Sequence, residues 1–188
     1  ICYNIFGEIM KKIILVSLSL IITVYSLWYA SLGGFVGNSG ALSKIGLEHP
    51  VLFAIWGILT YTTLALGIIL GLKKAKYKLF ILLLTIALIG MILTLCFDFD
   101  YDRHTQYTLH CIGSLTFSAV MGITVFLLFI INKSYYLAAA SGLILTADLI
   151  LLIIFKETAI IELTPIFSGY IMLCIHNLRK EKNYVEIK

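Results

Sequence analysis

Six apolar runs, each close to the length of a membrane-spanning helix, constrain this chain more than any other feature of its sequence. They cover approximately residues 13–30, 51–72, 79–97, 109–131, 135–155 and 160–177. About 20 apolar residues in an α-helix are needed to cross roughly 30 Å of hydrocarbon. Only 13% of all residues are charged, about half the share that is usual in soluble domains. The sequence therefore predicts an all-α integral membrane bundle of six transmembrane helices.

The chain is predicted to form a single transmembrane domain, residues 1–188, because no glycine-rich, serine-rich or charged linker divides it. The first nine residues precede Met10-Lys11-Lys12, which resembles a start, and they are left out of the fold prediction. Residues 31–50 contain five glycines and three serines. We expect them to form a loop that ends at Pro50, with a partly re-entrant course as one alternative.

Lysine and arginine are distributed unevenly among the connecting segments. With the N-terminus inside, the outer segments hold three, namely Lys44, Arg103 and Lys156. The inner segments hold eleven: Lys11, Lys12, Lys73, Lys74, Lys76, Lys78, Lys133, Arg179, Lys180, Lys182 and Lys188. Cytoplasmic loops carry the excess of positive charge, so both termini are predicted to be cytoplasmic, in the plasma membrane of a bacterium. Short basic runs of this kind indicate topology signals, so membrane lipids are the expected partners and nucleic acid is not.

Polar residues concentrate between the third and fourth runs, on the predicted outer side. Asp98, Asp100 and Asp102 alternate there, and His104 follows. Such a segment can wrap oxygen ligands around a hard cation, although Arg103 and Leu109 stand where an EF-hand loop has Gly and Glu. We favour the alternative, a solvated turn at the membrane surface. The cofactor is left unknown: a divalent metal ion is one candidate, with the three aspartates and His104 as candidate ligands.

Three residues are candidates for catalysis: His110, Ser114 and Asp148. His110 and Ser114 are four apart and share a helix face, so the histidine could activate the serine; a buried hydrogen bond is the alternative. Asp148 lies near the middle of the fifth run, where an ionised carboxylate costs roughly 2.5–3.5 kcal/mol on insertion scales. It is interpreted either as part of a proton pathway or as a neutral acid bonded to a neighbouring helix.

Three classes of function stay open at this point. The leading hypothesis is a small polytopic membrane protein that binds or senses a lipid or other hydrophobic ligand. Its outward-facing polar pocket would be lined by His49, Asp100, His104, His110, Asp148 and Glu162. The alternatives are a membrane-embedded, metal-dependent hydrolase of lipid esters or amides and a proton-coupled transporter with Asp148 as the relay. Six helices leave little room for a wide pore, so a channel would need a homo-oligomer.

An acidic segment, Phe97-Asp98-Phe99-Asp100, closes the third run, and His104 or His110 opens the fourth with Gly113-Ser114 behind it. Together with six spans and a glycine-rich first outer loop, this pattern resembles the DRAM/Sfk-type six-span membrane proteins. The resemblance covers the topology of most of the chain. It implies a role in membrane lipid organisation or trafficking, and it implies no catalytic residues.

Overall fold

The computed structural model describes residues 2–35, 40–72 and 77–179. Six lysines of the predicted inner set lie outside these residues: Lys73, Lys74, Lys76, Lys180, Lys182 and Lys188. Within the described residues the chain forms helices and no strands, and the all-α prediction is confirmed. The helices are α1 (Cys2–Ser31), α2 (Leu42–Glu48), α3 (Pro50–Gly71), α4 (Tyr77–Cys96), α5 (His104–Ile131), α6 (Tyr135–Phe155) and α7 (Ala159–Arg179).

All of these helices except α2 are long and apolar enough to cross a membrane, as predicted. They leave large apolar side chains on the outside of the bundle; Leu143 and Ile153 on α6, for example, are 72% and 74% exposed. A soluble monomer rarely exposes apolar surface on this scale. The outward faces of the long helices are therefore lipid-facing, and the chain is a polytopic membrane protein.

The helices differ from the predicted runs in three places. α1 begins at Cys2, well before residue 13. α5 begins at His104 instead of residue 109, because the polar residues of its first turns extend the helix beyond the apolar run. Residues 31–50 are not a loop throughout, since Leu42–Glu48 form α2. Gly46 permits this short helix to pack closely, because a Cβ there would lie 2.9 Å from Cγ of Phe53.

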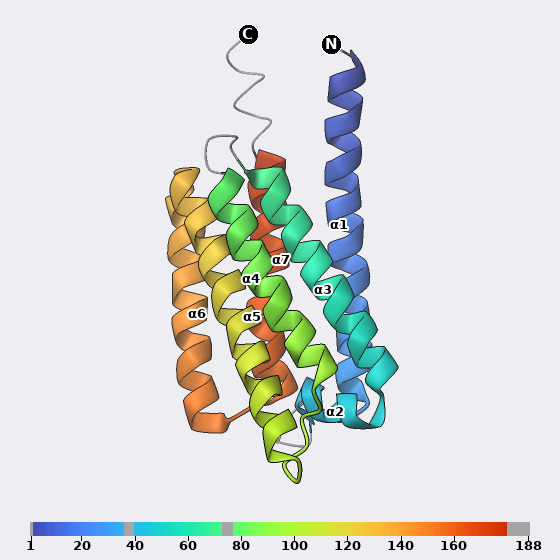
Figure 1. The fold of residues 1–188 in the computed structure, drawn as a ribbon. Helices are drawn as coiled ribbons and strands as arrows, with labels where there is room; N and C mark the ends of the chain where they lie inside the picture. Colours follow the sequence, from blue (N-terminus) through green and yellow to red (C-terminus); the bar gives the residue numbers. More distant parts are fainter. Residues whose placement is uncertain (1, 36–39, 73–76, 180–188) are drawn as a thin grey trace.

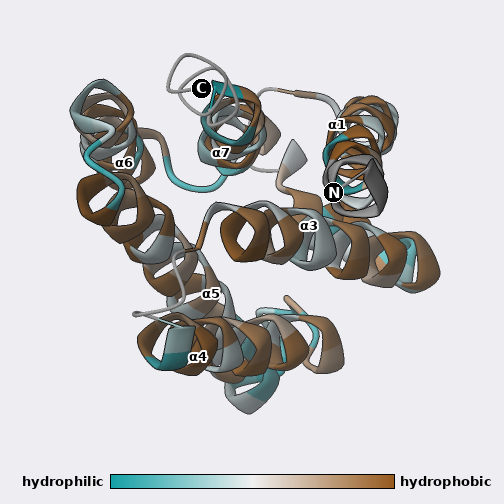
Figure 2. Cartoon of the chain, turned by 90° about the horizontal axis from the view of Figure 1, so that it is seen from above, coloured by the Kyte–Doolittle hydropathy of each residue, from teal (hydrophilic) through white to brown (hydrophobic). Residues whose placement is uncertain are grey.

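The six long helices lie side by side, with the start of α1 and the end of α7 at the same end of the bundle (Figure 1). α2 and the 97–103 loop lie at the opposite end, which we call the α2 end. Seen along the bundle, α3 lies between α1 and α7 on one side and α4 and α5 on the other (Figure 2). The cytoplasmic location of the termini remains a prediction from the charge distribution.

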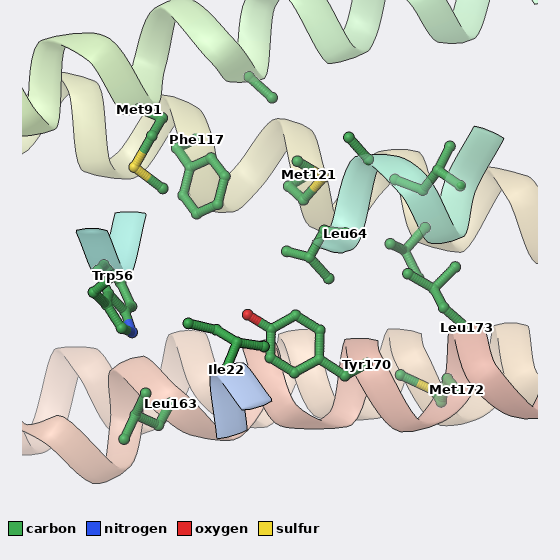
Figure 3. Close-up of a cluster of buried hydrophobic side chains, with 14 of the residues drawn as sticks. Ile22, Trp56, Leu64, Met91, Phe117, Met121, Leu163, Tyr170, Met172 and Leu173 are labelled. Carbon is green, nitrogen blue, oxygen red and sulfur yellow. The ribbon is translucent and has the colours of Figure 1, made fainter. Parts of the chain in front are cut away.

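Buried side chains of α3 form the centre of the core (Figure 3). Trp56 and Leu64 lie between Met91 and Phe117, on α4 and α5, and Tyr170 on α7. α4 and α5 make the closest contact in the bundle, through Gly90 and Gly113. A Cβ on Gly113 would lie 2.7 Å from the carbonyl oxygen of Gly90, so neither helix leaves room for a side chain there. This contact sets the distance between the end of α4 and the first turns of α5.

Candidate functional site

α2 is held in the bundle by side chains from the long helices. Its N-cap residue, Ala41, has no side-chain acceptor for the free backbone amides of the first turn. Glu162 of α7 supplies one, since its Oε2 accepts a hydrogen bond from the amide of Leu42 at 2.8 Å. The hydroxyl of Tyr29, on α1, donates to the carbonyl of Leu42 at 3.0 Å. These two contacts fix the position of Ser43, the next residue.

Ser43 and His110 form a buried hydrogen-bonded pair between α2 and α5. Oγ of Ser43 lies 2.8 Å from Nε2 of His110, and Nδ1 of His110 lies 2.8 Å from the carbonyl oxygen of Phe97. A carbonyl only accepts, so Nδ1 carries the ring proton. In the neutral ring Nε2 is then the acceptor, and the Ser43 hydroxyl donates to it. This is the order of hydrogen bonds in which a histidine can act as general base toward a serine.

Aromatic rings enclose the imidazole of His110, which is 1% exposed. Phe53 stacks on it with ring centroids 6.1 Å apart, and Phe99 approaches edge-on at 5.2 Å. Ser43 is 9% exposed. The two rings pack against the imidazole and hold it in one orientation. The Phe97 carbonyl orients Nδ1, as a carboxylate does in a Ser-His-Asp triad.

Ser43 was not among the residues singled out from the sequence. The predicted partner of His110 was Ser114, on the same helix, whereas the observed partner lies 67 positions earlier in the chain. Ser43 was missed because residues 31–50 were predicted to form a loop. The local signal that could have found it is the spacing of Leu42, Ile45 and Gly46, which share the buried side of α2.

The six residues proposed for the polar pocket belong to several different elements of the structure. His110 and Glu162 both contact α2, through Ser43 and Leu42. His49 and His104 are exposed at the α2 end, and Asp100 is partly buried in the 97–103 loop. The sixth residue, Asp148, belongs to α6.

The alternating aspartates lie in a turn in which Arg103 forms ion pairs with two of them. Asp100 accepts a hydrogen bond from the amide of Asp102 at 3.0 Å. Arg103 pairs with Asp98 and Asp100, each at 3.4 Å. Among the described residues, no three His, Cys, Asp or Glu side chains converge as metal ligands. The predicted ligands Asp98, Asp100, Asp102 and His104 therefore fit the solvated turn better than a metal centre.

Asp148 is partly buried on α6, and its Oδ1 is enclosed without a hydrogen-bond partner among the described residues. The helix around it faces lipid, since Leu149 and Ile153 are 54% and 74% exposed. Of the described long helices, α6 has the smallest buried share. No hydrogen bond joins Asp148 to Ser43 or His110 in the described part of the chain.

Lys44, Tyr101 and Glu157 lie together at the α2 end, next to Ser43. Nζ of Lys44 is 5.3 Å from the ring centroid of Tyr101, within the range of a cation–π contact. Glu157 lies in the turn between α6 and α7. Burial raises the pKa of Glu157, whereas the positive charges of Lys44 and Lys156 act to lower it. The ammonium group of Lys44 is therefore close enough to influence Glu157, without an ion pair to it.

A shallow apolar groove of about 440 Å³ runs along α1, lined by Leu20, Ile21, Val24, Tyr25 and Trp28. A chain of ring contacts connects its wall to the histidine. Tyr25 stacks with Tyr29 at 6.4 Å, Tyr29 with Phe53 at 6.4 Å, and Phe53 with His110. All five of its lining residues belong to α1, and it is open on the lipid-facing side of that helix.

Comparison with known proteins supplies no relative from which a role could be transferred. No protein-family model matches the chain, and the searches of curated proteins and of solved structures found no match. The resemblance to DRAM/Sfk-type proteins consequently remains an expectation from topology and a short acidic motif.

Proposed function

We propose that this membrane protein is a hydrolase of lipid esters or amides, with Ser43 as the nucleophile and His110 as the general base. The observation that carries the proposal is the hydrogen-bond series from Ser43 Oγ to His110 Nε2 and from Nδ1 to the Phe97 carbonyl, both 2.8 Å long. It replaces the metal-dependent version of the hypothesis, since the predicted ligands do not converge.

In the first half of the reaction, Oγ of Ser43 attacks the carbonyl carbon of the substrate while its proton passes to Nε2 of His110. The bond to the leaving alcohol or amine breaks, and the leaving group takes that proton. In the second half, water attacks the acyl-Ser43 carbonyl and gives a proton to Nε2. The proton returns to Oγ as the carboxylic acid departs. The Phe97 carbonyl holds Nδ1–H throughout and stabilises the transient imidazolium.

A lipid is the proposed substrate because the apolar surroundings of the pair favour one. The groove along α1 is apolar and open toward lipid, and the packed rings of Tyr25, Tyr29 and Phe53 connect its wall to His110. Lipid binding, the leading hypothesis from the sequence, becomes the binding step of this reaction. Its proposed residues are then Ser43, His110 and the α1 groove, in place of the six-residue polar pocket.

Replacing Ser43 by alanine tests the proposal. We expect the purified Ser43→Ala variant to lose at least about a thousandfold in kcat/KM on a fluorogenic lipid ester, because it lacks the nucleophile. Ser134→Ala is the matched control. It removes another serine–histidine hydrogen bond, 3.1 Å from Ser134 Oγ to His176 Nδ1, at the end of the bundle that holds the termini. Its activity should equal that of the original protein.

The result also separates catalysis from a purely structural role of the pair. If the Ser43–His110 contact only fastened α2, Ser43→Ala would lose stability without a selective loss of turnover. Ser134→Ala, which breaks a different contact, would behave in the same way. An original protein that hydrolyses no lipid ester or amide, or a Ser43→Ala variant with full activity, would contradict the proposal. Unfolding midpoints measured in the same detergent show whether each variant is folded.

Asp148 has no role in this mechanism. The transport alternative depends on it as a relay, and a relay needs a second group to receive the proton. Among the described residues Oδ1 of Asp148 has no hydrogen-bond partner. The Ser43–His110 pair, by contrast, has a complete series of partners, and we therefore favour hydrolysis.

A further inference from the structure

We infer that the substrate carries a phosphate group and that Lys44 binds it. The inference rests on the proposed function and names the substrate class for the same site: glycerophospholipids, as opposed to neutral glycerides. It concerns a residue that has no part in the chemical steps. The observations that support it are the position of Lys44, the absence of a salt bridge to it among the described residues, and the pairing of the neighbouring Arg103 with two aspartates.

Lys44 directly follows Ser43 on α2, so its flexible side chain starts beside the nucleophile. It is partly buried, and its ammonium group lies over the ring of Tyr101. In a glycerophospholipid only a few bonds separate the ester carbonyl from the phosphate. A cation one residue from the serine can therefore reach the phosphate while the ester carbonyl lies at Oγ.

Within residues 2–35, 40–72 and 77–179, no carboxylate lies within salt-bridge distance of the Lys44 ammonium group. The salt bridges found among the described residues at this end join Arg103 to Asp98 and Asp100. The charge of Lys44 acts on Glu157 and opposes the effect of burial, which raises the pKa of that carboxyl, but no salt bridge joins the two residues. A partly buried ammonium without a paired anion favours an anionic ligand, and lysine is a frequent phosphate ligand.

The other cations at the α2 end fit this role less well. Arg103 is occupied by its two aspartates. Lys156 is exposed, in the turn after α6, and lies far along the chain from Ser43. It does share one property with Lys44, since the charge of each lowers the pKa of Glu157. Lys156 is therefore a matched control for the electrostatic effect of removing a lysine at this end.

The test compares hydrolysis of phosphatidylglycerol and of diacylglycerol with the same acyl chains, in mixed micelles. Lys44→Gln should lower kcat/KM for phosphatidylglycerol roughly ten- to hundredfold, mainly through KM, because a hydrogen bond to a charged group is lost. Hydrolysis of diacylglycerol should not change. Lys156→Gln should behave as the original protein does on both substrates. Equal losses on both lipids, or no loss on phosphatidylglycerol, would overturn the inference while leaving the serine mechanism intact.

A binding measurement decides the role of Lys44 even if no turnover is found. Calorimetric titration of Ser43→Ala with short-chain phosphatidylglycerol should give an affinity that falls roughly ten- to hundredfold in Ser43→Ala/Lys44→Gln. The same affinity in both proteins would overturn the inference. Absence of lipid hydrolysis in the original protein, together with Lys44-dependent binding, would contradict the proposed function alone.

Discussion

His110 connects three segments that are far apart in the sequence. Its two ring nitrogens contact Ser43 on α2 and the carbonyl of Phe97 after α4, while its backbone belongs to α5. The ring is buried and Ser43 is only 9% exposed, so removing the imidazole leaves the serine hydroxyl with little access to water. One side chain thus both orders the α2 end and supplies the base for the proposed reaction.

Replacing His110 by leucine should therefore reduce stability as well as activity. The Ser43 hydroxyl and the Phe97 carbonyl would lose their partner, and an unsatisfied buried polar group costs about 1–3 kcal/mol. Unfolding of the purified protein in detergent would measure the loss. His49→Leu is the control, because His49 is exposed, and it should change the unfolding free energy little. Equal stabilities of the two variants would argue against a buried, bonded His110.

Among the residue-level predictions, the sequence identified His110 and Glu162 but not their partners. Both are polar groups within apolar runs, and the cost of burying them marks them as candidates. Ser43 and Leu42 carry no such mark, because they lie in a segment rich in glycine and serine. Pairing across 67 and 120 positions depends on how the helices pack, which the local pattern does not encode.

At the scale of elements, the packing of α4 against α5 determines whether the pair can form. Phe97 follows the end of α4, and His110 lies one turn before Gly113 on α5. Gly90 and Gly113 let the two backbones touch: a Cβ on Gly90 would lie 2.6 Å from the amide nitrogen of Phe117. Separating the helices at this point would move the Phe97 carbonyl away from Nδ1.

A methyl group at Gly113 should disturb this contact. Gly113→Ala places a Cβ 2.7 Å from the backbone of α4, and overpacking of this kind costs typically about 1–3 kcal/mol. Gly142→Ala is the control, because its Cβ would meet only the ring of Phe126, with Cε2 at 3.5 Å and Cδ2 at 3.8 Å, which are ordinary contact distances. Measured unfolding free energies should fall for the first variant and stay equal or rise for the second. A Gly113→Ala protein of unchanged stability would contradict the close α4–α5 contact.

The long helices could be predicted from the sequence because each must bury about 20 apolar residues in hydrocarbon. α2 could not, since its seven residues are too short for a clear period and its glycine suggests a turn. Its stability comes from outside the segment, through Glu162, Tyr29 and His110. A helix that depends on contacts with distant residues cannot be predicted from the helix propensity of its own residues.

On the scale of the whole molecule, the residues of the proposed reaction lie at one end of a mostly apolar bundle. The α2 end holds the Ser43–His110 pair, the cation of Lys44 and the partly buried Glu157. The charge distribution predicts that this end faces outward. Six long apolar helices form the bundle, and α2 places Ser43 against His110 of α5 at this end.

The most direct test of this account is covalent labelling of the purified protein with a long-chain alkyl fluorophosphonate, followed by mass spectrometry of its peptides. An activated serine displaces fluoride from such a probe and keeps the phosphonyl group. The account predicts an adduct on Ser43, formed much more slowly in His110→Leu and at the original rate in Ser134→Ala. A Ser43 that stays unlabelled, or that is labelled equally fast without His110, would contradict the proposed serine–histidine mechanism.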